Sequence, residues 1–561
     1  MNRAAEQYRP LFWLTTATLV AAMVLGGGTR AGYFGDAVVQ LIAIPTLLGA
    51  VALTLRDREA HGWILGWAAA LLLLFVLHLV PLPQTIWMRL PLSGVTASVY
   101  EQIGKSPGWR PLSVSPHDTW IALLSFLPPA AVFFAVLHLS DNQKTQLLKI
   151  VLGLVVISCA TGLWQVAALS GYATQAEKPL SSDPTGFFRN RNHFAALLYC
   201  ALLIAAAVMI DRWREAIARG KLARSASAFA VPAMSLILIV MSLALIVLSR
   251  SRAGMVIAIA ALIGAVLIAK LPDPRKLRQG ALRWVILVSA LMFIAVSQYA
   301  FTRILLRFGE DPLQDGRATI VETAWPVAWS LMPFGSGFGT FVPVYKAFEQ
   351  PSAALMGVYV NRAHNEFLEL WMEAGIPGLV VLGFAVLWLV RRISDVVVSS
   401  AEQWQPGGRQ LSVAAAMLVV LLLAHSAVDY PLRTASLACI FALSCGILAR
   451  PIGLGSVASE LPALEVSKAE VGSQDAGAED AKFRPFQIAG AVVPDNWAPP
   501  TIIKPGQPLA KEKAAGQTLV PVDKADWHRG EQQSRQTGPD VGGSDGWPDV
   551  WRKRTTNPSE D

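Results

Sequence analysis

One histidine, His364, stands in a polar stretch that separates two apolar blocks late in the chain, within the string NRAHNEFLELWMEAGIPGL from Asn361 to Leu379. Histidine is the side chain best suited to accept a proton near neutral pH. The sequence therefore makes His364 the first candidate for a general base. A structural histidine held by hydrogen bonds is the alternative.

The residues around His364 are also polar, and their spacing matters. If Ala363 to Ala374 is helical, Asn365, Glu369 and Glu373 fall on one face of that helix. On the same assumption Arg362 and Glu366 stand four residues apart and form a pair. The spacing predicts a polar helix face next to the candidate base.

Two clusters of arginine precede apolar blocks. The string GFFRNRNHFAALL holds Arg189, Arg191, Asn192 and His193. The string LSRSRAGM places Arg250 and Arg252 in a very short turn between two apolar blocks. The planar fork of an arginine pairs with two phosphate oxygens at once, so both clusters suit a phosphate ligand. Anchoring at the membrane surface is the alternative.

Two further segments complete the set of candidates. Arg317 and Arg362 belong to a long polar segment, where simple solvation or contact with lipid phosphate is the alternative. In HSAVDYPLR, the spacing of His425 and Asp429 places them on one helix face, and a structural hydrogen-bonded pair is the plain interpretation.

Several chemistries find no positive signal. The stretch GSGFG is followed by Thr340 and Phe341 and not by the lysine of a phosphate-binding loop, so nucleotide binding is unsupported. No HExxH motif and no Cys or His spacing typical of a metal site occurs in these segments. The four cysteines, which all lie in apolar blocks, predict no disulfide framework.

The composition shows what must position these residues. Of the 561 residues 53% are hydrophobic and 15% are charged, whereas soluble domains carry roughly 25% charged residues. The apolar residues come in blocks of about 20, the length that crosses a bilayer. We therefore expect an all-α polytopic membrane protein with about 12 transmembrane helices. The expected spans are 11–28, 36–55, 62–82, 119–139, 147–169, 192–210, 229–248, 253–270, 281–300, 375–391, 410–430 and 433–449.

Charge in the short loops predicts the orientation. Basic residues cluster at Arg56 and Arg58, at 211–224, at 270–278 and at Arg391 and Arg392, and all of these fall on one side of the expected membrane. Because positive loops stay in the cytoplasm, we expect both termini there. Residues 83–118, 170–191 and 301–374 then lie on the outer side.

The expected organisation has four parts: an N-terminal transmembrane bundle of about nine spans (1–300), a large periplasmic loop (301–374), C-terminal transmembrane helices (375–450) and a cytoplasmic tail (451–561). The tail holds 12 Lys and Arg against 16 Asp and Glu and is net −4, while the preceding 450 residues are net +12. Its composition predicts disorder.

The strings resemble those of the O-antigen ligase and O-antigen polymerase superfamily of bacterial envelope glycosyltransferases. The resemblance rests on their order along residues 10–450 and their placement on expected outer loops. They are PLSVSPHDT, NRNHFA, SRSRAG, the Arg317 to Trp325 spacing with GSGFGTF after it, AHNEFLELWMEAGIPGL and HSAVDYPLR.

This resemblance implies a metal-independent glycosyltransferase with no cofactor, in the bacterial inner membrane and with a periplasmic active site. The donor would be a glycan on undecaprenyl diphosphate, and the acceptor a hydroxyl of lipid A-core or of a growing glycan. His364 would take the acceptor's proton. Arg189, Arg191, Arg250, Arg252, Arg317 and Arg362 would supply a diphosphate clamp, with Asn192, His193, Asn365, Glu369, His425 and Asp429 in support. The partners would be membrane lipid and the glycan substrates, and no nucleic acid is expected.

Four functions stay open on this scaffold, and a protein O-oligosaccharyltransferase ranks low among them because the sequence shows no added soluble outer domain to hold a polypeptide acceptor. A ligase is the first expectation, and a polymerase of O-antigen or exopolysaccharide repeat units is the alternative. A transporter or flippase of the same lipid-linked glycan ranks lower, because the sequence shows no internal repeat and its polar residues concentrate at one membrane face.

Overall fold

The computed structural model describes residues 8–29, 32–90, 93–106, 108–172, 183–219, 226–271, 316–350 and 359–454. The chain divides into two units, Met1–Glu465 and Val466–Asp561, and all described residues belong to the first. The expected span 281–300 and the expected tail from residue 455 onward lie outside the described residues.

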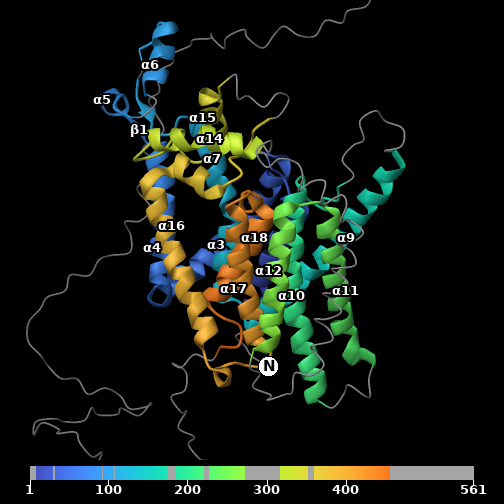
Figure 1. Ribbon diagram of the computed structural model, residues 1–561. Coiled ribbons are helices and arrows are strands. Elements are labelled where there is room, and N and C mark those ends of the chain that lie inside the picture. Colours follow the sequence, from blue (N-terminus) through green and yellow to red (C-terminus); the bar gives the residue numbers. More distant parts are fainter. Residues whose placement is uncertain are drawn as a thin grey trace, which may run out of the picture. The chain divides into compact units, whose positions relative to one another are not determined.

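The described chain is mostly helical (Figure 1). Its first half contains α2 (Arg9–Leu25), α3 (Phe34–Arg56), α4 (Arg58–Leu79), β1 (Pro81–Leu82), α5 (Gln84–Trp87), α6 (Ser93–Gln102), β2 (Arg110–Pro111), α7 (Pro116–Ser125), α8 (Leu127–His138) and α9 (Asp141–Tyr172). The remainder contains α10 (Arg191–Ala218), α11 (Ala226–Leu248), α12 (Arg252–Lys270), α14 (Gly316–Ser330), α15 (Phe341–Phe348), α16 (Glu366–Val398), α17 (Gly408–Ser426) and α18 (Ala435–Ala449). Two short 3₁₀ turns, η2 (Ala401–Gln403) and η3 (Pro431–Arg433), flank α17, and β1 pairs antiparallel with β2.

The expectation of an all-α polytopic membrane protein is confirmed. Among the described residues, nine helices are long and apolar enough to cross a bilayer, and α7 with α8 counts as one of them. Two further apolar helices, α2 and α18, are shorter. Every expected span that falls within the described residues coincides with one of these helices.

Helix α10 forms the centre of the helical core. Its sequence is apolar on every side from Phe194 to Ile210, and each of these residues is buried. A helix that is apolar all round must be enclosed by other helices, and α10 is packed against α9, α11, α12, α17 and α18. It therefore holds Arg191, Asn192 and His193, at its N-terminus, in a fixed place relative to the ends of its neighbours.

Two arginines of the basic segments, Arg214 and Arg392, bind the C-terminal ends of neighbouring helices. Arg214 of α10 donates to the carbonyl of Ala269, in the last turn of α12, and to that of Leu271, the residue after α12. Arg392 of α16 donates to the carbonyls of Leu448 and Ala449 at the end of α18. The expected placement of all the basic segments on one side of the membrane stays a prediction. The N-termini of α10, α12, α16 and α18 lie at the end opposite to these two arginines.

At that opposite end α14 lies across the spans, and α16 is bent (Figure 1). The bend is at Gly375, whose φ of 56° and ψ of −152° interrupt the helix. The glycine-rich loop packs against this bend. The amide of Gly337 donates to the carbonyl of Glu373 at 2.8 Å, and the amide of Ile376 donates to the carbonyl of Pro333 at 2.9 Å. The close backbone approach that these glycines allow is made to the chain itself.

Candidate active site

Two segments that are not helical meet at the end of the spans opposite to Arg214 and Arg392. His364 ends the loop before α16, and Asp429 lies in the turn after α17. His364 Nδ1 is 3.1 Å from Asp429 Oδ1. The histidine side chain is 21% exposed and the aspartate is fully buried. A proton-accepting group thus lies at a surface with a buried carboxylate behind it.

Asp429 is the centre of this polar group. Asn192 Nδ2 donates to its Oδ2 at 2.6 Å, Arg317 Nη2 lies 3.4 Å from the same oxygen, and the amide of Tyr430 donates to Oδ1 at 3.0 Å. Burial opposes ionisation, but the hydrogen bond with His364 and the neighbouring cations hold the pKa of Asp429 well below its usual range.

The ionised state of Asp429 decides the tautomer of His364. A carboxylate can only accept hydrogen bonds, so His364 Nδ1 must carry the proton that it donates to Asp429. In the neutral ring the lone pair is then on Nε2, which contacts no donor among the residues that the structure describes. This is the arrangement that a histidine needs to act as a general base.

An aromatic ring fixes the position of the imidazole. Tyr430 meets His364 edge to face at a centroid distance of 4.9 Å and meets His193 on its other side at 4.8 Å. Burial raises the pKa of the Tyr430 hydroxyl above its usual value. His193 is fully buried, and neither of its ring nitrogens has a hydrogen-bond partner within the described part of the chain. His193 therefore contributes to the site through the packing of its ring against Tyr430.

The second polar group is a pair of arginines on one carboxylate. Asp183 is buried, and it accepts from Arg191 and, at 2.5 Å, from Arg250. The side chains of Arg191 and Arg250 are 27% and 35% exposed. Two guanidiniums on a single carboxylate leave an excess positive charge, so this group suits an anionic ligand.

The two polar groups adjoin each other. Arg191 binds Asp183 while the next residue, Asn192, binds Asp429.

Of the non-glycine residues in the described chain, Arg250 and His364 alone have a positive φ, of 53° and 52°. Such backbone conformations cost about 1–3 kcal/mol each and concentrate at functional sites. Both strained residues carry a side chain of this candidate site.

The structure places the other predicted arginines differently. Arg317 donates to the carbonyl of Val428 at 3.0 Å, beside Asp429. Arg252 opens α12 two residues after Arg250. Arg189 lies over the ring of Tyr33, 5.6 Å from its centroid. The predicted pool of six arginines therefore divides among several partners.

The predicted pair of Arg362 with Glu366 is wrong, because the helix begins only at Glu366. Arg362 lies in the preceding loop and donates to Glu369 at 2.8 Å, while Glu366 accepts from the amide of Leu432 at 2.8 Å. Asn365 caps the helix, since its side chain accepts from the amides of Phe367 and Leu368. Glu369 and Glu373 do share a face, and both contact Arg433.

The predicted common helix face of His425 and Asp429 is also wrong. Helix α17 ends at Ser426, so Asp429 lies in the turn beyond it. The ring of His425 is buried and its Nδ1 is 3.1 Å from the hydroxyl of Tyr199 in α10. His425 therefore supports the packing of α17 against α10, and Asp429 is left to bind His364.

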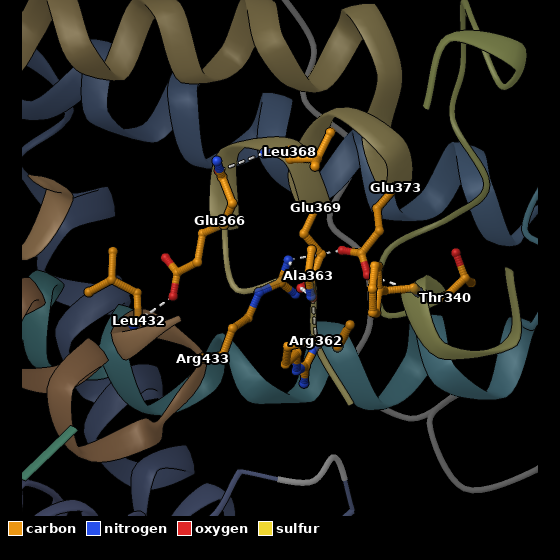
Figure 2. A network of polar contacts seen from close by, with 12 residues as sticks. Thr340, Arg362, Ala363, Glu366, Leu368, Glu369, Glu373, Leu432 and Arg433 are labelled. Carbon is orange, nitrogen blue, oxygen red and sulfur yellow. Dashed lines mark hydrogen bonds and ion pairs between the residues drawn. The ribbon is translucent and has the colours of Figure 1, made fainter. Parts of the chain in front are cut away.

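Figure 2 shows an ion network in which Arg362 and Arg433 lie among the carboxylates of α16. Glu369 and Glu373 are fully buried. Burial opposes the charged form of Arg433, but the carboxylates of Glu369, Glu373 and Glu366 raise the pKa of its guanidinium above its usual value. Arg433 therefore stays protonated in this network.

Sequence reasoning missed three residues of the site. Asp183 had one available signal, an acidic residue a few positions before an arginine cluster. Tyr430 and Arg433 stood within a quoted string, but nothing in their spacing indicates a partner 60 or more residues away. Within the described ranges, no three His, Cys, Asp or Glu side chains are grouped so as to hold a metal ion.

Residues 236–383 match a protein-family model described as O-antigen ligase. The match runs from α11 into α16 and includes Arg250, Arg317 and His364. No curated protein matches the chain.

Proposed function

Because this chain belongs to the O-antigen ligase superfamily, we propose that it is a glycosyltransferase that moves a glycan from undecaprenyl diphosphate onto an acceptor hydroxyl. The observation that carries the proposal is the pairing of His364 with the buried, ionised Asp429 at 3.1 Å. The family supports a membrane protein of ligase or polymerase type, and the donor and acceptor are part of the proposal.

The proposed reaction is a single displacement. The acceptor oxygen attacks the anomeric carbon of the donor sugar, and the bond from that carbon to the diphosphate oxygen breaks. His364 Nε2 takes the hydroxyl proton, and Asp429 stabilises the imidazolium that results. A positioned base contributes about 10²–10⁴ to a rate. One displacement at the anomeric carbon inverts its configuration.

Undecaprenyl diphosphate leaves as an anion, and the proposed binding groups are cations. Arg191 and Arg250 already converge on Asp183, and their exposed portions are free to contact a ligand from the surface. The N-termini of α10 and α12 lie at the same place, and their partial positive charge favours a phosphate. The charge that develops on the leaving group would be stabilised there.

The proposed acceptor is a sugar of lipid A-core, as in a ligase. The same residues serve a repeat-unit polymerase, in which the acceptor is the growing glycan. We propose that the site faces the periplasm and that both termini are cytoplasmic, because Arg214 and Arg392 of the basic segments bind the C-terminal ends of their neighbouring helices, away from the site.

The test compares purified wild type with His364→Ala and His117→Ala in lipid nanodiscs, with an undecaprenyl-diphosphate-linked glycan as donor and lipid A-core or free glycan as acceptor. His117 is an exposed histidine of α7 and is the matched control. We expect His364→Ala to lose at least about 100-fold in transfer and His117→Ala to keep wild-type transfer.

The acceptor that is consumed separates the two enzymes. Sugar attached to lipid A-core identifies a ligase, and a longer glycan on the lipid carrier identifies a polymerase. Wild-type transfer by His364→Ala would remove His364 from the mechanism. Movement of the lipid-linked glycan across the bilayer without any transfer would favour a flippase instead.

A further inference from the structure

The two members of the His364 and Asp429 pair come from segments that have no helical structure of their own to hold them. His364 also has a positive φ of 52°, a conformation that persists only where surrounding contacts enforce it. Some group must therefore fix the loop before α16 and the turn after α17 relative to each other.

Glu369 contacts both segments. Its Oε1 accepts from Arg362 at 2.8 Å, and its Oε2 accepts from the backbone amide of Ala363 at 3.1 Å. Ala363 is the residue directly before His364. Glu369 Oε1 also lies 3.3 Å from Arg433, four residues beyond Asp429. One carboxylate thus bridges the two chain segments that carry the candidate catalytic pair (Figure 2).

The neighbouring glutamates hold only parts of this arrangement. Glu373 binds Arg433 at 3.0 Å and accepts from the amide of Phe341, but it contacts neither Arg362 nor Ala363. Glu366 accepts from the amide of Leu432. Of the three glutamates, only Glu369 contacts both the loop that carries His364 and the segment that follows Asp429.

Buried ion pairs contribute little net stability compared with apolar residues of the same size, and their better-attested use is to specify one geometry. Glu369 is fully buried and has a cation on each side. We propose that Glu369 is a positioning residue of the transfer reaction: it holds His364 at hydrogen-bond distance from Asp429 by binding Arg362, Ala363 and Arg433 together.

This inference rests on the proposed function. It does not require Glu369 to touch either substrate, since the carboxylate is enclosed by the chain. Its loss should therefore impair the chemical step and leave binding of the lipid-linked donor intact.

The first variant is Glu369→Gln, which keeps the shape of the side chain and removes its charge. A misplacement of about 1 Å at a catalytic group costs about 100-fold, and we expect kcat to fall by about that factor with KM for the lipid-linked donor unchanged. Glu373→Gln is the matched control, since it removes the same charge and one contact with Arg433. Its loss should be several-fold smaller.

A cycle of variants distinguishes positioning from general damage to the fold. In the wild type, Asp429→Asn should lower kcat strongly. In the Glu369→Gln protein, where His364 is already displaced from Asp429, the same substitution should cost little more. In the Glu373→Gln protein it should cost as much as in the wild type. Equal costs in all three backgrounds would overturn the proposal, because lost folding reduces every rate by the same factor.

Arg433→Lys provides a second variant if Glu369→Gln does not give a monodisperse protein. Arg433 contacts Glu369 and Glu373 through the same nitrogen, Nη2. Lysine keeps the charge, but its shorter side chain would not place the ammonium between the two carboxylates, so we expect a fall in kcat of about tenfold. Wild-type kcat in a folded Glu369→Gln or Arg433→Lys protein would contradict the positioning role of Glu369 but not the proposed function. Wild-type transfer by His364→Ala contradicts the proposed function as well.

Discussion

His364 Nδ1 and Asp429 Oδ1 lie 3.1 Å apart although 65 residues separate them in the chain. The aspartate brings Asn192 and Arg317 to the same place, so residues from α10, α14, the loop before α16 and the turn after α17 meet at one carboxylate.

Asp429→Asn should lower kcat by about 10²–10⁴, because an amide cannot stabilise the imidazolium and also permits the wrong tautomer of His364. The turnover of lipid-linked glycan in nanodiscs measures this. Asp395→Asn is a suitable control, since Asp395 is 43% exposed and binds Arg392 near the other end of α16. Wild-type kcat in Asp429→Asn would exclude the aspartate from the mechanism.

The low pKa of Asp429 predicts how stability depends on pH. A carboxyl group whose pKa is lower in the folded state contributes stability above its unfolded pKa of about 3.9, and that contribution is lost as the pH falls towards the folded pKa. The difference in Tm between wild type and Asp429→Asn should stay constant from about pH 8 to pH 5. It should narrow only below about pH 4.

Thermal unfolding in detergent at a series of pH values measures this difference in Tm. A difference that already closes between about pH 7 and pH 6 would mean that Asp429 takes up its proton near neutrality, contrary to the direction of its pKa shift.

Arg191→Lys and Arg250→Lys should each weaken use of the lipid-linked donor. A hydrogen bond to a charged group contributes about 1.5–3 kcal/mol, so each substitution should lower kcat/KM by roughly 10- to 100-fold. Inhibition by free undecaprenyl diphosphate should weaken in parallel. Arg189→Lys should cost much less, because Arg189 lies over Tyr33 and not on Asp183. Equal losses in all three variants would argue against a clamp centred on Asp183.

Gly375→Ala should destabilise the protein. Gly375 has a φ of 56°, and an added Cβ would lie 2.3 Å from the carbonyl oxygen of Pro333. Strain at such a position costs about 1–3 kcal/mol, which a fall in Tm should reveal. Gly383→Ala in the same helix is the control, since nothing lies within 4 Å of its added Cβ. That substitution should leave Tm unchanged or raise it slightly.

The spans could be predicted from the sequence because the length of an apolar block is a local property that any bilayer imposes. The same is true of the basic loops and of the candidate residues His364, Arg191 and Arg250, whose chemistry depends on residue type. Each expected span within the described chain is a helix. The expected ion pair of Arg362 failed because the helix starts three residues later than the polar pattern suggested.

Only the tertiary structure decided which charges meet. Asp429 was expected to face His425, but α17 ends at Ser426 and the aspartate turns to His364. Asp183 gathers Arg191 and Arg250 from two helices, and Glu369 joins Arg362 to Arg433. No local sequence pattern predicts such pairs, because the partner of a buried charge depends on which distant segments the packing brings into contact with it.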